Sequence, residues 1–221
     1  MDLEQQVAGV AALDHDVSRA AYRLVLAEGW VSRDRAAEAL GVARSVAAFH
    51  LDKLLDAGLL TTRYERTSGR SGPGAGRPAK LYGRSDAEFD VSLPPRRYDL
   101  ASALLARGVE RAREEREPVE QAVARAATDA GVEAGQACHG RSASTRVTGL
   151  LEGHGYALRR RGKETALLNC PFHKLAQEHR DLVCGMNLCF LRGALEGTAA
   201  DGWQARLAPE PGYCCVRLDA P

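Results

Sequence analysis

The chain has 221 residues and a formal net charge of +1 at pH 7, with 45% hydrophobic and 27% charged residues, an ordinary composition for a globular protein. No stretch approaches the roughly 18 consecutive apolar residues of a transmembrane helix, and the acidic N-terminus lacks the pattern of a signal peptide. We therefore expect a cytoplasmic protein with no membrane partner. Its six cysteines are expected to be reduced, metal-binding or redox-active rather than disulfide-linked.

The first quarter of the chain has the pattern of a helix-turn-helix. An apolar stripe predicts a helix over residues 14–29, and a short helix follows over residues 33–40, with Ser32 as its N-cap and Gly41 at its C-terminal end. A third helix is expected over residues 43–57 and leads into a strand. Its apolar positions are Val46, Phe49, Leu51, Leu54 and Leu55. This order of elements is typical of a helix-turn-helix motif.

A basic segment, residues 61–85, follows the predicted third helix. It contains six basic residues against one acid, a local charge of +5 in a chain whose total is +1. Strand-like residues 62–66 and 79–82 flank a glycine-rich apex, which predicts a basic hairpin suited to phosphates or the minor groove. In isolation such a stretch would be interpreted as a solvated linker, but its place after a helix-turn-helix pattern favours DNA binding.

The segments GVARSVAAFHLDKLLDAGLL (residues 41–60) and GRPAKLY (residues 76–82) resemble the winged-helix domain of ArsR- and DeoR-like bacterial repressors. The resemblance implies that the third helix enters the major groove of an operator duplex and that the hairpin is the wing. It implies these DNA-contacting residues: Arg44, Ser45, Ala47, Ala48, His50, Arg70, Arg77 and Lys80. Alanines cannot form side-chain hydrogen bonds, so specificity is expected from Arg44, Ser45, thymine methyl contacts and DNA shape. The alternative for His50 is a place at the edge of the core.

The predicted domains are a winged helix over residues 1–85, a proline-containing linker over 86–97, a helical segment over 98–137 and a cysteine-rich domain over 138–221. In the helical segment, Pro118 is expected to separate two helices. Paired helices beyond a small DNA-binding domain often join two copies, and two half-sites one helical turn apart require a dimer. We therefore expect a homodimer.

The last domain predicts an α+β sandwich, so the fold class of the whole chain is α+β. Its helices are expected over residues 144–154, 173–179 and 181–195, and its strands over residues 156–160, 164–168, 203–207 and 213–218. Helices and strands are both expected along this part of the chain.

The cysteines differ in their expected surroundings. Cys170 precedes a proline, which favours a helix N-cap, where the helix dipole lowers a thiol pKa. Cys184 is expected to begin the next helix. Cys189 lies about 140° around that helix from Cys184 and is expected to be an ordinary core thiol. Alternation in the last strand favours Cys214 as the inward thiol over Cys215, although a strand distorted by ligation could present either.

Spacing alone is a weak signal for a metal site. The chain contains no C-x-x-C pair, so zinc ribbons and fingers are not indicated, and a reduced buried thiol is the plain alternative at each position. However, LNCPFHKLA (residues 168–176), LVCGMN (182–187) and PGYCCV (211–216) resemble the C-terminal domain of SufR-type regulators, which are iron–sulfur-cluster-binding winged-helix repressors of cluster-assembly operons. The order of the domains agrees with this resemblance.

The resemblance implies a 4Fe-4S or 2Fe-2S cluster, with three cysteines as ligands, the third being one of the adjacent pair. The remaining iron of a four-iron cluster would need a histidine, a carboxylate, the second terminal cysteine or an exogenous ligand. The candidate ligands are Cys170, Cys184, Cys214, Cys215, His173 and His179. The implied function is a DNA-binding transcriptional regulator, expected to be a repressor, controlled by its cluster. The alternatives are zinc or a thiol–disulfide switch in the same regulator, and an enzyme with Cys170 as nucleophile, for which no orienting motif is present.

Overall fold

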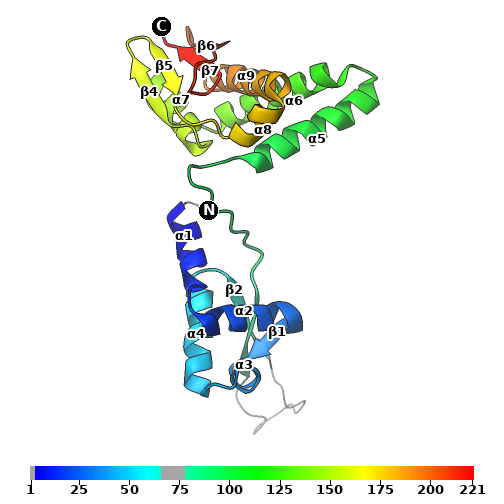
Figure 1. The fold of residues 1–221 in the computed structure, drawn as a ribbon, viewed down its shortest axis with the longest axis vertical. Helices are drawn as coiled ribbons and strands as arrows, with labels where there is room; N and C mark the ends of the chain where they lie inside the picture. The colour runs from blue at the N-terminus through cyan, green and yellow to red at the C-terminus, as the bar shows by residue number, and fades with distance from the viewer. Residues whose placement is uncertain (1–2, 66–77) are drawn as a thin grey trace. The chain divides into compact units, whose positions relative to one another are not determined.

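The computed structural model describes residues 3–65 and 78–221 of the chain (Figure 1). Within these ranges the protein is α+β, with nine α-helices and two small antiparallel sheets, as the sequence predicts for the fold class. The chain divides into two compact units, residues 1–91 and 92–221. None of the described helices is both long and apolar enough to cross a membrane.

The first unit places a small sheet beside a group of helices. Its elements in chain order are α1 (Leu3–Ala12), α2 (Asp16–Glu28), β1 (Trp30–Ser32), α3 (Arg33–Leu40), α4 (Arg44–Asp56), β2 (Leu60–Glu65) and β3 (Ala79–Arg84). Strand β3 lies between β1 and β2 and is antiparallel to both. Helix α1 and strand β1 were not predicted. The apex expected at residues 68–78 lies outside the described residues except for Pro78.

Local sequence signals explain the turn between α3 and α4. The Ser32 hydroxyl accepts a hydrogen bond from the Arg35 backbone N–H at 3.1 Å and so caps α3. Gly41 ends α3 with a φ of 63°, a left-handed conformation that glycine adopts without a Cβ clash. Both predictions are confirmed. The core beneath the turn joins fully buried side chains of α2, α4 and β3, among them Val25, Leu54 and Tyr82.

The second unit combines long helices with a four-stranded sheet. Its elements are α5 (Tyr98–Glu115), α6 (Val119–Gln136), α7 (Ala143–Gly153), β4 (Leu158–Arg161), β5 (Glu164–Leu167), α8 (His173–Glu178), α9 (Arg180–Gly197), β6 (Gln204–Leu207) and β7 (Val216–Asp219). The strands lie in the order β4-β5-β7-β6, all antiparallel. Helices α5 and α6 are separate, as predicted from Pro118, which is the N-cap of α6.

Helix α9 is the central helix of this unit. It packs closely along α6, because a Cβ on Gly131 of α6 would overlap the Phe190 carbonyl oxygen and one on Gly193 of α9 would overlap the Thr128 carbonyl oxygen. One hydrophobic core therefore includes residues from both halves of the unit, such as Leu104 of α5 and residues of α9 and β7. The helical segment 98–137 shares its core with residues 138–221.

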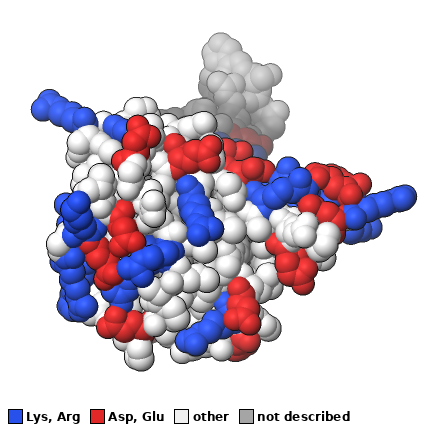
Figure 2. Space-filling view, turned by 90° about the horizontal axis from the view of Figure 1, so that it is seen from above, with Lys and Arg blue, Asp and Glu red and all other residues white. Residues whose placement is uncertain are grey.

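Charged side chains are mixed in sign on the face of the molecule shown in Figure 2. In the second unit several charged side chains form pairs within one sheet or one helical hairpin. Arg206 of β6 bonds Glu164 of β5 and Asp219 of β7, and Arg111 of α5 bonds Asp129 of α6. Exposed pairs of this kind each contribute at most about 1 kcal/mol. They indicate a solvated surface and not a site.

Candidate functional site

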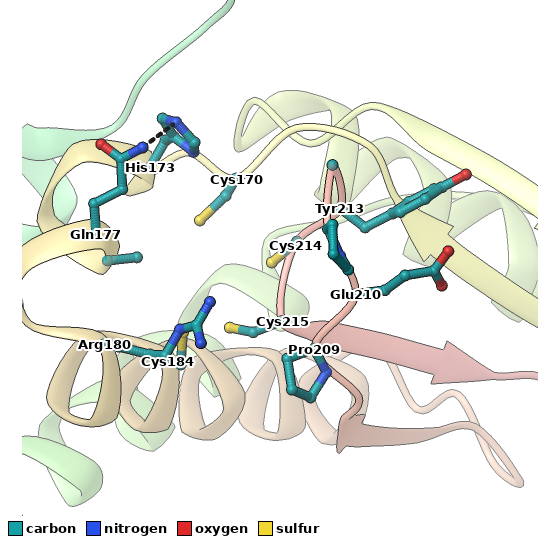
Figure 3. A pocket seen from close by; sticks show the side chains of 13 residues that line it. Cys170, His173, Gln177, Arg180, Cys184, Pro209, Glu210, Tyr213, Cys214 and Cys215 are labelled. Carbon is teal, nitrogen blue, oxygen red and sulfur yellow. Dashed lines mark hydrogen bonds between the residues drawn. The ribbon is translucent and has the colours of Figure 1, made fainter.

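Four of the six cysteines line one cavity of about 720 Å³ in the second unit (Figure 3). The loop before α8, the facing sides of α8 and α9, and the loop between β6 and β7 form its walls. The lining includes Cys170, His173, Gln177, Arg180, Cys184, Glu210, Tyr213, Cys214 and Cys215. Segments up to 45 residues apart in sequence, from Cys170 to Cys215, therefore contribute thiols to a single space.

Cys170 lies in a turn and not at a helix N-cap. Its carbonyl accepts hydrogen bonds from the His173 backbone N–H at 3.1 Å and from the Arg96 guanidinium at 2.7 Å. Helix α8 begins at His173, and its N-cap is Phe172, whose side chain is fully buried. The predicted N-cap position of Cys170 was wrong.

Cys184 lies in the second turn of α9, which begins at Arg180, so it does not start the helix as predicted. Cys214 and Cys215 precede β7, which begins at Val216, so the alternation argument does not apply to them. The Cys214 backbone N–H donates to the Leu167 carbonyl at 2.8 Å, and the Cys215 carbonyl accepts from the Ala208 N–H at 2.8 Å. The irregular backbone between these bonds lets both adjacent thiols line the cavity.

The four thiols interact in the order Cys170, Cys214, Cys215, Cys184. A hydrogen bond with Cys214, together with burial, raises the pKa of Cys170, so the lowering predicted from a helix dipole was wrong. The pKa of Cys214 is lowered by Cys170 but raised more by Cys215 and burial, to about 12, and Cys184 raises the pKa of Cys215 to about 12. The hydrogen bond with Cys215 lowers the pKa of Cys184. A soft metal would displace the thiol protons on binding.

Of the two histidines expected as ligands, only His173 lines the cavity. Its Nε2 atom lies 3.1 Å from Gln177 Nε2. His179 connects α8 to α9 and does not line the cavity. Cys189 is also outside it and packs against the hydrophobic core, as expected for an ordinary thiol. Cys138 packs against the same core away from the cavity.

Two buried polar residues, Tyr156 and Asn187, form a hydrogen-bonded chain that ends on the Cys214 thiol. The Tyr156 hydroxyl donates to Asn187 Oδ1 at 2.5 Å, and Asn187 Nδ2 donates to Cys214 Sγ at 3.3 Å. Sequence reasoning missed both residues, because a single Asn within the apolar pattern of α9 gives no signal of its partner. Burial, and then the neighbouring cysteines, raise the pKa of Tyr156 well above its usual value, so its hydroxyl is a donor.

The thiols are not arranged around a point. In residues 3–65 and 78–221, the structure contains no group of three or more His, Cys, Asp or Glu side chains that could hold a single metal ion. A zinc ion requires its ligands to converge at about 2.0–2.3 Å. A polynuclear iron–sulfur group is larger and takes thiolates from around its perimeter. Thiols are the donors that such a group takes, and four of them line the cavity.

The exposed side of α4 forms a second candidate site, in the first unit. Arg44 and Ser45 are exposed at its N-terminal end, and the Arg44 guanidinium bonds Asp34 of α3 at 2.5 Å. Ala47 is fully buried and Ala48 is half-buried. Arg44 and Ser45 are thus available to a ligand on this surface, whereas Ala47 is not.

His50 belongs to the core of the first unit and not to the surface of α4. Its side chain is 6% exposed, and its Nδ1 atom lies 2.8 Å from the Ser18 hydroxyl of α2. Burial, and then the charges of His15 and Lys53, lower its pKa, which favours the neutral ring. The interpretation of His50 as a core-edge residue is the one that this burial supports.

Two of the apolar positions of the predicted third helix are exposed on α4. Phe49 is 65% exposed and Val46 is 39% exposed, and both lie within about one turn of Ser45. The helical pattern placed them among the apolar positions of the helix. It could not show that no other described element covers the side of the helix they occupy. Among the described residues they are an apolar surface that sequence reasoning missed.

Lys80 is held within the first unit. Its Nζ atom lies 2.9 Å from Asp52 Oδ1 of α4, and the Tyr82 hydroxyl donates to the same oxygen at 2.7 Å. Arg33 of α3 completes the group, because its guanidinium bonds Asp52 Oδ2 at 2.7 Å. Arg70 and Arg77, the other expected contacts on the hairpin, lie outside the described residues. No protein family, curated protein or solved structure matches the chain.

Proposed function

We propose that the chain is a DNA-binding transcriptional regulator, acting as a homodimeric repressor, whose affinity for DNA is set by an iron–sulfur cluster in the second unit. The observation that carries the proposal is the meeting of four thiols from separate segments around one cavity of about 720 Å³. Scattered core cysteines would have no reason to converge in this way, and the two remaining cysteines do not.

The donor set supports a cluster. Cys170, Cys184 and one or both of Cys214 and Cys215 would hold it, with His173 the histidine that lines the same cavity. Thiolates are the usual ligands of iron–sulfur clusters. When bound, such a group supplies sensitivity to oxidants, nitric oxide or iron shortage. The chain's own residues provide the walls: buried Cys214 on one side, and Arg180 of α9 on another.

The element order of the first unit supports a winged helix-turn-helix. Helices α3 and α4 are joined by a tight turn at Gly41, and β2 and β3 form the antiparallel hairpin that follows. In this proposal α4 enters the major groove with Arg44 and Ser45 near its N-terminus, and the basic hairpin contacts the backbone or minor groove. The local charge of +5 over residues 61–85 favours phosphates.

The second unit offers a physical route from the cluster to a dimer. Cys184 lies on α9, and α9 packs closely along α6, which in turn packs against α5. Helix α5 presents the 47%-exposed Val109 to its surroundings. Loss of a cluster that links α9 to the loops before α8 and β7 would loosen this helical layer and so alter the spacing of two DNA-binding units.

The test is DNA binding by loaded and cluster-free protein. Duplexes enriched from a random-sequence library by the anaerobically purified, cluster-loaded protein should bind that protein at least about tenfold more tightly than the chelator-treated, reduced form. Equal affinity of the two forms would contradict regulation by a cluster. Failure to enrich any duplex would contradict DNA binding. Colourless protein with stoichiometric zinc, or metal-free protein with a reversible disulfide, would instead support a zinc-binding or thiol-redox regulator.

A further inference from the structure

The side-chain amide of Asn187 forms a hydrogen bond with one of the four thiols of the cavity, that of Cys214. Its Nδ2 atom donates to Cys214 Sγ at 3.3 Å, while its Oδ1 atom accepts from the Tyr156 hydroxyl at 2.5 Å. All three side chains are nearly or fully buried, with exposed fractions of 1% for Asn187, 3% for Tyr156 and 1% for Cys214. The hydrogen bonds therefore operate away from bulk water, where they are strongest.

Burying the Asn187 amide costs free energy, which its hydrogen bonds must offset. Asn187 is a buried amide in α9, and its neighbours Met186 and Leu188 are buried apolar residues. Burying an amide without partners costs roughly 1–3 kcal/mol in proteins, so this residue is stable there only because both ends are bonded. Asn187 lies three residues after Cys184, so the same helix carries one thiol and the amide that contacts another.

The orientation of the Asn187 amide suits a Cys214 sulfur that is bound to iron. A thiolate sulfur bound to iron has no proton and can only accept, so the NH₂ end of the Asn187 amide must face it. The Tyr156 hydroxyl then donates to the carbonyl end and holds the amide in that orientation. Cys215 differs, because it is only half-buried and interacts with the Cys184 and Cys214 thiols.

We infer that Asn187, held by Tyr156, is a positioning residue that directs Cys214 into the cavity as a cluster ligand and withdraws negative charge from its sulfur. The inference rests on the proposed cluster. Hydrogen bonds to ligating sulfurs raise the reduction potential of an iron–sulfur cluster, because they stabilise the reduced, more negative state. Of the adjacent cysteines, Cys214 is therefore the fixed ligand, and Cys215 is dispensable for holding the cluster.

The test compares reduction potentials in the full chain under anaerobic conditions. The double variant Tyr156→Phe/Asn187→Leu removes both polar groups together, so that neither is left buried and unpaired, and should shift the cluster potential to a more negative value. Tyr156→Phe alone keeps the amide N–H and serves as the matched control, with a smaller shift. In parallel, Cys214→Ser should lose iron and sulfide, whereas Cys215→Ser should retain both.

A second measurement needs no substitution. The chain contains two asparagines, Asn169 and Asn187, and the Asn169 amide nitrogen donates instead to the Pro95 and Gly155 carbonyls. Protein labelled with ¹⁵N at the asparagine side chain should show a ¹⁵N hyperfine coupling to the reduced, paramagnetic cluster.

Each outcome decides the inference. An unchanged potential in the folded double variant, an absent ¹⁵N coupling, or loss of the cluster in Cys215→Ser but not in Cys214→Ser would overturn the assignment while leaving the proposed cluster intact. Wild-type protein without iron and sulfide would overturn the proposed function and this inference with it.

Discussion

Asp52 of α4 and Lys80 of β3 are joined by an ion pair, with 2.9 Å between Oδ1 and Nζ. Because Arg33 and Tyr82 bond the same carboxylate, Asp52 connects α3, α4 and β3, the second strand of the hairpin. The pair therefore has a structural role in the first unit, and Lys80 has a partner other than a phosphate.

Removing this carboxylate should destabilise the first unit. Asp52→Asn leaves two cations without their anion, and we expect the free energy of unfolding to fall by about 1–2 kcal/mol, less than for a fully buried pair because Asp52 is partly exposed. Trp30 fluorescence during urea unfolding reports on this unit once Trp203 is replaced by Phe. The matched control is Asp56→Asn at the exposed end of α4, which should change little. Equal stability of Asp52→Asn and wild type would contradict the role of Asp52.

The buried neutral His50 should make the first unit sensitive to acid. Burial lowers its pKa from 6.5 in the folded state, so its contribution to stability is complete above pH 6.5 and is lost as the pH falls below that value. His50→Gln removes the titration, and its stability should fall less than that of wild type between pH 7 and pH 5. Trp30 fluorescence in urea series at each pH measures this, with His139→Gln as a control in the other unit. Parallel curves for wild type and His50→Gln would contradict the prediction.

Phe49 should contribute to DNA affinity without contributing to folding. Its side chain is 65% exposed on α4, and phenylalanine can contact the methyl group of thymine in the major groove. We expect Phe49→Ala to weaken binding of the enriched duplex by roughly 1–3 kcal/mol, with an unchanged melting temperature. Leu207→Ala, an exposed apolar residue of the second unit, is the control.

Uracil substitution separates methyl contacts from general packing. Replacing each thymine of the enriched duplex with uracil removes one methyl group, and at one or more positions this should weaken the wild-type protein but not Phe49→Ala. If both proteins lose the same affinity at every position, Phe49 does not contact a thymine methyl group.

Local signals predicted much of the fold. The Ser32 cap, the left-handed Gly41 and the break at Pro118 depend on backbone chemistry within a few residues, so sequence alone identified them correctly. The covered side of an element depends on distant segments instead. Phe49 was therefore counted with the apolar positions of its helix, although its side chain is 65% exposed.

The cysteine site was predicted in composition but not in geometry. The resemblance selected the four thiols that line the cavity, and helical geometry set Cys189 apart from them. Sequence patterns placed Cys170 at a helix N-cap and the adjacent pair on a strand. In the structure α8 begins after Phe172, and the pair, bonded through its backbone to Leu167 and Ala208, precedes β7. The bond between Cys214 and Leu167 joins residues 47 positions apart and leaves no local pattern.

The central claim is that these thiols hold an iron–sulfur cluster, and iron and acid-labile sulfide measured per chain in anaerobically purified protein test it most directly. Wild type, Cys138→Ser and Cys189→Ser should be brown and contain both elements in equal, stoichiometric amounts. Cys170→Ser and Cys184→Ser, which each remove a thiol from the cavity, should lose most of both. Colourless wild-type protein without iron and sulfide, or equal cluster content in all these variants, would contradict the account.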